Sequence, residues 1–136
     1  MTTQSELEGI DAQGIWRNFS GSITSRPGRT QMPATEDALI RFVREGESAG
    51  EKIRVVGAGH SCTPLVSTAG ALVSLDRLHG VLSTDPARAT ARIAAGTKIS
   101  ALGVPLRAAG LATINQGDVD VQAPVSYTHL TLPTKA

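Results

Sequence analysis

Short apolar runs separated by glycine, proline and polar residues predict a mixed fold of brief strands and two helices. The clearest helical signal follows Thr35, whose side chain can cap a helix, with the acidic residues Glu36 and Asp37 in the first turn. Apolar residues then recur at the spacing of one helix face, at positions Ala38, Leu39, Phe42, Val43 and Ala49. Gly50 suits the position just after a last helical turn, so the helix is expected to end there.

Strands are expected where β-branched and other apolar residues cluster between turn residues. The pattern predicts short strands between Trp16 and Met32, a buried strand at Ile53–Val56, and strands at 72–75, 80–84 and 89–95. Asp85 and Pro86 predict a turn between the last two. A second helix is expected from about Ile99 to Ala109, because Leu102 and Leu106 are one turn apart.

Composition suits a soluble globular domain and points to no nucleic-acid or membrane partner. Hydrophobic residues make up 40% of the chain and aromatic residues only 3%, so the core must rely on Val, Leu, Ile and Ala. The formal net charge is +1, and no apolar run approaches the roughly 20 residues of a membrane span. The single cysteine, Cys62, cannot form a disulfide within the chain, which fits a cytoplasmic protein. No His and Cys cluster has metal-ligand spacing, so no metal is expected.

The segment from Arg54 to Leu65, RVVGAGHSCTPL, carries the most informative chemistry. A β-branched run enters a loop with Gly57 and Gly59, which can adopt positive φ and leave the backbone open to close approach. Consecutive backbone N–H groups in such a loop can converge on a phosphate. His60 adds a possible nucleophile toward whatever the phosphates carry. The segment therefore predicts a site for a phosphate-bearing cofactor.

Two kinds of cofactor site fit a glycine loop that follows a strand. In a Rossmann site a helix starts after the second glycine and an acid follows about 20 residues later, a role that Asp76 could fill. After Gly59, however, the chain contains Pro64, several β-branched residues and Gly70, and proline costs about 3 kcal/mol inside a helix. The pattern favours a loop that wraps a diphosphate without a helix, and a Rossmann-type NAD site is the alternative.

Several motifs, in order along residues 14 to 122, resemble one known family. They are WRNFSG at 16–21, PATE at 33–36, V-x-G-x-G-H-S-x-T-P-L at 55–65, L-V-S-L-D-x-L-x-G-V at 72–81, A-G-T-x-I-x-x-L-G-x-x-L at 95–106 and G-L-A-x-x-N-x-G-D-V-D-x-Q at 110–122. Together they are similar to the PCMH-type FAD-binding domain of the vanillyl-alcohol-oxidase superfamily. Within that superfamily the chain resembles the aldonolactone and alditol oxidases.

The resemblance implies an α+β fold: the first subdomain of the FAD-binding domain, a small sheet with flanking helices, and the truncated start of the second. It implies FAD as the cofactor, with contacts from Val56, Gly57, Ala58, Gly59, His60, Ser61, Gly117 and Asp118. In the resembling oxidases the histidine of G-x-G-H-S is bonded to the 8α-methyl group of the flavin, so His60 is expected to carry FAD covalently. Free histidine titrates at about pH 6.5, so a neutral, nucleophilic imidazole is available at pH 7.

Each of these residues also has a purely structural interpretation. The two glycines of the loop could serve only a tight turn, and Ser61 could satisfy a local backbone donor. His60 could hydrogen-bond the loop or the cofactor without a covalent bond, and Asp118 could be a solvated loop acid. Cys62 is expected to be a small buried packing residue rather than a second flavin tether.

The function implied by the resemblance is oxidation of a CH–OH group of a sugar-1,4-lactone or an alditol. Hydride passes to flavin N5, and the electrons go on to oxygen or another acceptor. A flavin-free binding module that reuses the fold is a further alternative. Family members carry the substrate base and much of the pocket in a C-terminal domain, so no catalytic residue is expected in this chain. The expected plan is a disordered segment at 1–13, a partial FAD-binding domain at 14–123 and no substrate domain, and the chain alone is expected to be inactive.

The last residues follow a different pattern. The family motifs stop after Gln122, and residues 125–134 read VSYTHLTLPT. One reverse translation of this stretch resembles the transposon-end adapter used in sequencing libraries. Residues 124–136 are therefore expected to be a non-native tail, and Tyr127 and His129 receive no functional interpretation.

Overall fold

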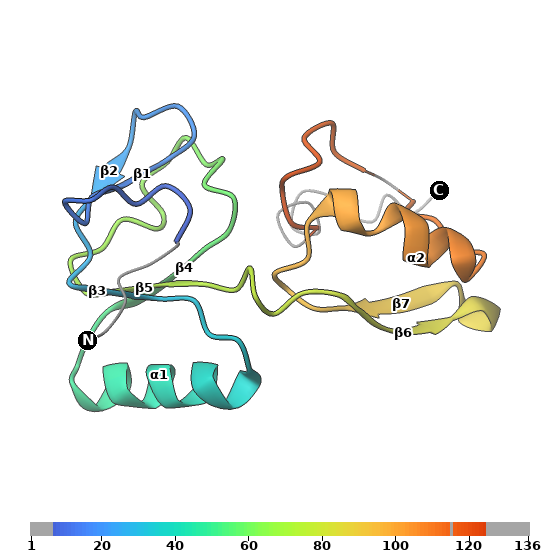
Figure 1. Ribbon diagram of the computed structural model, residues 1–136, viewed down its shortest axis with the longest axis horizontal. Coiled ribbons are helices and arrows are strands. Elements are labelled where there is room, and N and C mark those ends of the chain that lie inside the picture. The colour runs from blue at the N-terminus through green and yellow to red at the C-terminus, as the bar shows by residue number, and fades with distance from the viewer. Residues whose placement is uncertain (1–6, 115, 125–136) are drawn as a thin grey trace, which may run out of the picture. The chain divides into compact units, whose positions relative to one another are not determined.

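The computed structural model describes residues 7–114 and 116–124 (Figure 1). The chain divides into two compact units, residues 1–77 and residues 78–136. The expected tail at 125–136 lies outside the described residues.

A three-stranded parallel sheet forms the centre of the first unit (Figure 1). Its strand order is β3 (Arg29–Gln31), β5 (Ala71–Ser74) and β4 (Ile53–Val56), so β5 pairs on both sides. All four residues of β5 are buried, which is typical of a parallel strand with neighbours on both edges. The predicted strand at 53–56 is confirmed, but the expectation that it is buried throughout is wrong. Because β4 lies at an edge of the described sheet, its residue Val55 is 54% exposed.

Helix α1 (Glu36–Ser48) covers one face of this sheet and confirms the first predicted helix (Figure 1). The Thr35 side chain accepts a hydrogen bond from the backbone N–H of Ala38, at 3.2 Å, and Gly50 follows the helix with φ +66°. Phe42 is 2% exposed and belongs to a buried cluster with Ala71 and Val73. The predicted face is wrong at Val43 and Ala49, which are exposed. The stripe that faces the sheet instead runs through Leu39, Phe42 and Gly46, which are three and four residues apart.

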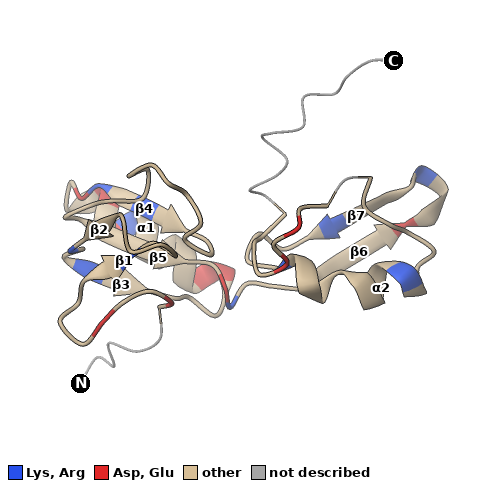
Figure 2. Cartoon of the chain, turned by 90° about the horizontal axis from the view of Figure 1, so that it is seen from above, with Lys and Arg blue, Asp and Glu red and all other residues tan. Residues whose placement is uncertain are grey.

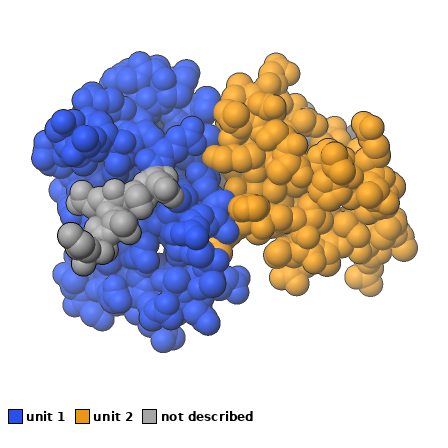
Figure 3. Space-filling model, in the orientation of Figure 1, with its two compact units in different colours: residues 1–77 blue, residues 78–136 orange. Residues whose placement is uncertain are grey.

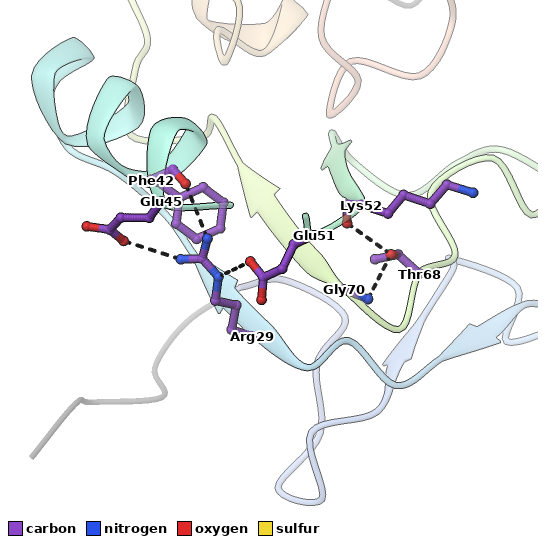
Figure 4. Close-up of polar contacts among 7 residues, drawn as sticks. All are labelled: Arg29, Phe42, Glu45, Glu51, Lys52, Thr68 and Gly70. Atoms are coloured by element: carbon purple, nitrogen blue, oxygen red, sulfur yellow. Dashed lines mark hydrogen bonds and ion pairs between the residues drawn. The ribbon is translucent and has the colours of Figure 1, made fainter. Parts of the chain in front are cut away.

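Arg29, the first residue of β3, contacts both helix α1 and Glu51, which precedes β4 (Figure 4). Its Nε donates to Glu51 Oε2 at 2.7 Å, and its Nη2 donates to the Phe42 carbonyl at 3.2 Å. A second carboxylate oxygen, Glu45 Oε2, lies 3.5 Å from Nη1, and the guanidinium carbon lies 4.1 Å from the centre of the Phe42 ring. Arg29 therefore links helix α1, the start of β3 and the residue Glu51 that precedes β4.

The opposite face of the sheet is covered by the chain that precedes β3 (Figure 1). Strands β1 (Trp16–Arg17) and β2 (Thr24–Ser25) pair antiparallel there. Trp16 forms a buried cluster with Leu7, Val56 and Leu72, with Ile10, Ile23 and Val66 packed against it. The described residues 7–13, expected to be disordered, thus take part in the packed structure, because Leu7 is 6% exposed and Ile10 forms a β-bridge with Trp16.

Residues 78–136 make up the second unit (Figure 3). Its described part contains an antiparallel pair of strands and a short helical segment. Strands β6 (Val81–Asp85) and β7 (Thr90–Ile93) confirm the predicted hairpin. The turn between them is a 3-10 helix at Pro86–Arg88, and Asp85 Oδ1 accepts from the Arg88 N–H at 3.1 Å. This contact closes the turn that the Asp–Pro pair predicted.

The second predicted helix is wrong as one continuous element. The chain forms a 3-10 helix at Ile99–Ala101 and then α2 (Gly103–Ala108). Pro105 has no N–H to donate to the carbonyl four residues earlier, so an unbroken ladder cannot run through it. Leu102 and Leu106 are nevertheless both buried, which confirms that they share the inward face.

Charged residues of both signs are spread along the described chain rather than gathered by sign (Figure 2). This distribution agrees with the small net charge. Among residues 7–114 and 116–124, no helix is long and apolar enough to cross a membrane.

We predict that Gly70→Ala destabilises the first unit by about 1–3 kcal/mol, because an added methyl group would force the backbone apart. A Cβ at Gly70 would overlap the carbonyl oxygen of Lys52, which already accepts from the Ala71 N–H at 3.0 Å and from Thr68 Oγ1 at 3.2 Å (Figure 4). Urea unfolding of the 136-residue chain, followed by circular dichroism, measures the change. Gly57→Ala is the control, since a Cβ there meets no described atom within 4 Å. Equal midpoints for the two variants would contradict the prediction.

We also predict that Asp11 makes the stability of this unit depend on pH. The pKa of Asp11 is held below its ordinary value, chiefly by the Ile15 N–H that donates to its carboxylate at 2.9 Å, with further help from the Gln13 N–H and from Arg17. A lowered pKa stabilises the folded state above the unfolded pKa, and this stabilisation is lost as pH falls through the folded-state pKa. Asp11→Asn should therefore lower the urea midpoint at pH 7, and this deficit should shrink as pH falls through the folded-state pKa of Asp11. A deficit of the same size at every pH would rule out the charge as the cause.

Candidate functional site

The candidate loop begins where β4 ends, at the carboxyl edge of the parallel sheet. Val56 is the last residue of β4, and its side chain is buried in the core beside Trp16 and Leu72. Its side chain therefore fixes the start of the loop, and only its backbone is available to a ligand. In open parallel sheets, ligands bind beyond the carboxyl ends of the strands.

The structure of the loop requires glycine at position 59 but not at position 57. Gly59 has φ +66°, and a Cβ there would lie 3.3 Å from the Trp16 ring, so both conformation and packing favour glycine. Gly57 lacks the positive φ that was expected to explain it. A Cβ on Gly57 would meet no described atom within 4 Å. Neither the fold nor the described neighbours thus require glycine at 57, and its missing side chain leaves the backbone open to a ligand.

Backbone donors of the loop are available for such a ligand. Within the part of the chain that the structure describes, the N–H groups of residues 57–61 donate to no protein acceptor. The loop segment from Val56 to Ser61 carries no acidic side chain that would repel an anion. Successive free N–H groups around an open glycine suit a diphosphate. On these observations the loop fits the phosphates of FAD.

His60 is half-buried and held on two sides. Its Nδ1 lies 2.8 Å from the carbonyl oxygen of Ala58, and because a carbonyl only accepts, Nδ1 carries the hydrogen. In a neutral ring the lone pair is then on Nε2. The ring also stacks on Phe19, with centroids 4.8 Å apart and planes 8° from parallel. The imidazole is therefore fixed in place by contacts from its own loop and from a distant segment.

The residues after His60 form a compact turn. Ser61 Oγ accepts from the Thr63 N–H at 3.2 Å and lies 3.0 Å from Thr63 Oγ1. The hydroxyl of Ser61 thus has the local structural role, while its backbone N–H faces no protein acceptor. The expectation that Cys62 is buried is wrong, because the residue lies exposed at the outside of this turn.

The course of the chain after Gly59 separates the two cofactor hypotheses. Residues 60–70 run through bends and turns to β5 and contain no helix. A Rossmann site requires a helix whose N-terminus faces the pyrophosphate. The NAD-type alternative therefore lacks its defining element here.

Gly117 and Asp118 belong to the second unit, whereas the loop belongs to the first. Gly117 is half-buried and Asp118 is exposed. The residues that follow are attached to the 3-10 helix, since the Ser100 N–H donates to Asp120 O and the Ile99 N–H donates to Gln122 O, each at 2.9 Å. The segment is thus held within its own unit.

Sequence reasoning gave no role to Asn18 and Phe19, which contact the loop directly. Asn18 Nδ2 donates to the Ser61 carbonyl at 3.1 Å, and the Phe19 N–H donates to the Gly59 carbonyl at 3.0 Å. Their signal in the sequence was the WRNFSG motif at 16–21. The motif marks them as part of the pattern but does not say what they touch.

In the described ranges, no group of three or more His, Cys, Asp or Glu side chains could hold a metal ion.

We predict that Gly57→Ala and Gly59→Ala fail in different ways. Gly57→Ala should leave the unfolding free energy unchanged and weaken FAD binding at least about tenfold, because the methyl group occupies the ligand's side of the backbone. Gly59→Ala should lower the unfolding free energy by about 1–2 kcal/mol, because alanine is strained at positive φ. Urea unfolding of the apoprotein and titration of FAD fluorescence measure the two effects in a full-length protein that carries this sequence. Unchanged FAD affinity in Gly57→Ala would refute the assignment of the open face.

Comparison with known proteins identifies the family. Residues 27–123 match the family described as "FAD binding domain". The chain is 34% identical over 114 residues to L-gulono-1,4-lactone dehydrogenase of Mycobacterium tuberculosis, covering 84% of this chain and 27% of that protein. It is 34% identical over 128 residues to D-arabinono-1,4-lactone oxidase of Eremothecium gossypii, covering 88% of this chain and 24% of that protein. The chain thus spans about a quarter of the length of these relatives.

A solved structure supports the same fold. Cholesterol oxidase from B. sterolicum matches with a TM-score of 0.64 at 23% identity, over 81% of this chain and 22% of that one. The match confirms the expected α+β fold of a partial PCMH-type domain. The two relatives above confirm the resemblance to the aldonolactone oxidases. The chain belongs to the PCMH-type FAD-binding domain family of the vanillyl-alcohol-oxidase flavoproteins.

Proposed function

We propose that this chain is the N-terminal, cofactor-holding part of an FAD-dependent oxidoreductase that oxidises a CH–OH group of a sugar-1,4-lactone or an alditol. The observation that carries the proposal is the loop at 57–61, where free N–H groups surround the open Gly57 and His60 follows in the same loop. The names of the two relatives, a gulono-1,4-lactone dehydrogenase and an arabinono-1,4-lactone oxidase, support the substrate class.

The N–H groups of Gly57 to Ser61 would hold the diphosphate of FAD, and Gly57 would allow its close approach. Gly117 and Asp118, which stand in the Gly–Asp motif, would provide a second contact with the cofactor. The bound flavin supplies the redox chemistry, taking hydride at N5 and passing the electrons to oxygen or another acceptor. The protein binds and orients it.

His60 would hold the flavin covalently. Attachment would replace one C–H bond of the 8α-methyl group by a C–N bond to the imidazole. The two electrons and the proton released from the methyl group would go to the same oxygen or other acceptor, with a second proton from water when the acceptor is oxygen. If Nε2 forms the bond, the ring becomes an imidazolium whose Nδ1–H keeps its hydrogen bond to Ala58 O, whereas attachment through Nδ1 breaks that hydrogen bond.

The remaining proposals concern the extent and location of the protein. Residues 14–123 would form part of the FAD-binding domain, 124–136 would be a non-native tail, and the substrate base would lie on a C-terminal domain. A cytoplasmic location is supported by the single cysteine, which rules out a disulfide within the chain.

The test uses a full-length protein that carries this sequence. Purified wild type should show flavin absorbance and oxidise L-gulono-1,4-lactone, D-arabinono-1,4-lactone or an alditol, with oxygen or an artificial dye as acceptor. Its polypeptide should fluoresce on an acid-treated denaturing gel. His60→Ala should lose that fluorescence, keep FAD bound non-covalently, and turn over about tenfold more slowly because the cofactor is less well oriented.

Three results would count against these proposals. Lack of a flavin absorbance band would favour the flavin-free binding module. If none of the lactones and alditols is oxidised, the proposed substrate class is wrong. A wild-type polypeptide without fluorescence would remove the covalent bond alone. For the 136-residue chain by itself, weak FAD binding and no turnover are expected. Stoichiometric FAD on that chain would contradict the first expectation, and oxidation of any of these substrates would contradict the second.

A further inference from the structure

We propose that Phe19 is a positioning residue for His60: its ring sets the plane of the imidazole for attachment to the flavin. The two rings stack at a centroid distance of 4.8 Å with planes 8° apart. Phe19 is 60% exposed, so burial in the core does not account for an aromatic residue at this place. Near-parallel stacking at this distance is favourable for aromatic pairs.

The chain around Phe19 is bonded to both sides of His60. The Phe19 N–H donates to the carbonyl of Gly59 at 3.0 Å, and Asn18 Nδ2 donates to the carbonyl of Ser61 at 3.1 Å. The residues before and after His60 are thus tied to two consecutive residues of one segment. The ring of Phe19 cannot slide along the loop without breaking these bonds.

Asn18 is itself firmly held. Its side chain is 4% exposed, its Oδ1 accepts from the Ile23 N–H at 3.0 Å, and its backbone N–H donates to the Ile23 carbonyl at 3.0 Å. The amide group also donates to Ser20 Oγ at 3.1 Å and to Ser22 Oγ at 3.2 Å. Trp16, two residues earlier, is buried in the core. Phe19 is therefore attached to Asn18, which is fixed by several hydrogen bonds, and lies close in sequence to Trp16 in the hydrophobic core.

Two contacts together define the orientation of the imidazole. Stacking on Phe19 fixes the plane of the ring, and the hydrogen bond from Nδ1 to Ala58 O fixes its rotation within that plane. A nucleophile held in one geometry reacts faster because the entropy of alignment is already lost, and a displacement of about 1 Å can cost about 100-fold in rate. The inference rests on the proposed covalent bond at His60.

The experiment follows flavin attachment in a full-length protein that carries this sequence. Apoprotein made under riboflavin limitation is mixed with FAD, and in-gel flavin fluorescence is recorded against time, beside total FAD bound before denaturation. The variants are Phe19→Leu, Phe19→Tyr and His60→Ala, with Ile40→Ala as the matched control. Ile40 is an exposed apolar residue of α1, at 45% exposure.

Phe19→Leu should bind wild-type amounts of FAD but attach it at least about tenfold more slowly, because leucine fills space without offering a ring face. Phe19→Tyr keeps the ring and should attach FAD at the wild-type rate. If Phe19 only filled space as an apolar side chain, Phe19→Leu would attach FAD as fast as Phe19→Tyr. Ile40→Ala should match wild type, and His60→Ala should show no attachment.

Wild-type attachment rates in Phe19→Leu would overturn the inference and leave the His60 bond standing. Loss of total bound FAD in both Phe19 variants would also overturn it, since the residue would then serve folding or binding. Wild-type protein that binds FAD but never attaches it would overturn the proposed bond itself, and with it any role for Phe19 in attachment.

Discussion

Strand β5 must have hydrogen-bonding partners on both edges and apolar cover on both faces, because all four of its residues are buried. Strands β3 and β4 provide the edges. Phe42 of α1 covers one face, and the cluster around Trp16 covers the other. Parallel pairing with β5 sets the register of β4, and so sets the point at which the glycine loop leaves the sheet. The candidate site is therefore a consequence of how one strand is buried.

The chain before β3 serves both the core and the site. Trp16 packs against Val56 and Leu72 and also approaches Gly59, while the next residues bond to the loop on both sides of His60. Trp16 therefore contributes both to the stability of the first unit and to the position of the loop. The segment is short, but it connects the buried sheet to the half-buried ring of His60.

The described residues are suited to holding a cofactor rather than to selecting a substrate. The loop offers neutral N–H donors and one oriented imidazole, while the redox chemistry of the family belongs to the flavin. The chain covers about a quarter of each of the two lactone-oxidising relatives, and that quarter matches the FAD-binding domain family. The proposed role of this part of the protein is to hold and orient FAD.

Most of the local elements and the kind of cofactor could be predicted from the sequence. The Thr35 cap, the Gly50 terminus, the strand before Gly57 and the hairpin around Asp85 depend on neighbouring residues, so short-range pattern was sufficient. Motif order likewise identified the family. Only the packing of distant segments shows which strand lies at the edge, why Val55 is exposed, and which residues support His60. The contact between Asn18 and Ser61, for example, joins residues 43 positions apart, and spacing along the chain does not encode which distant segment will pack against the loop.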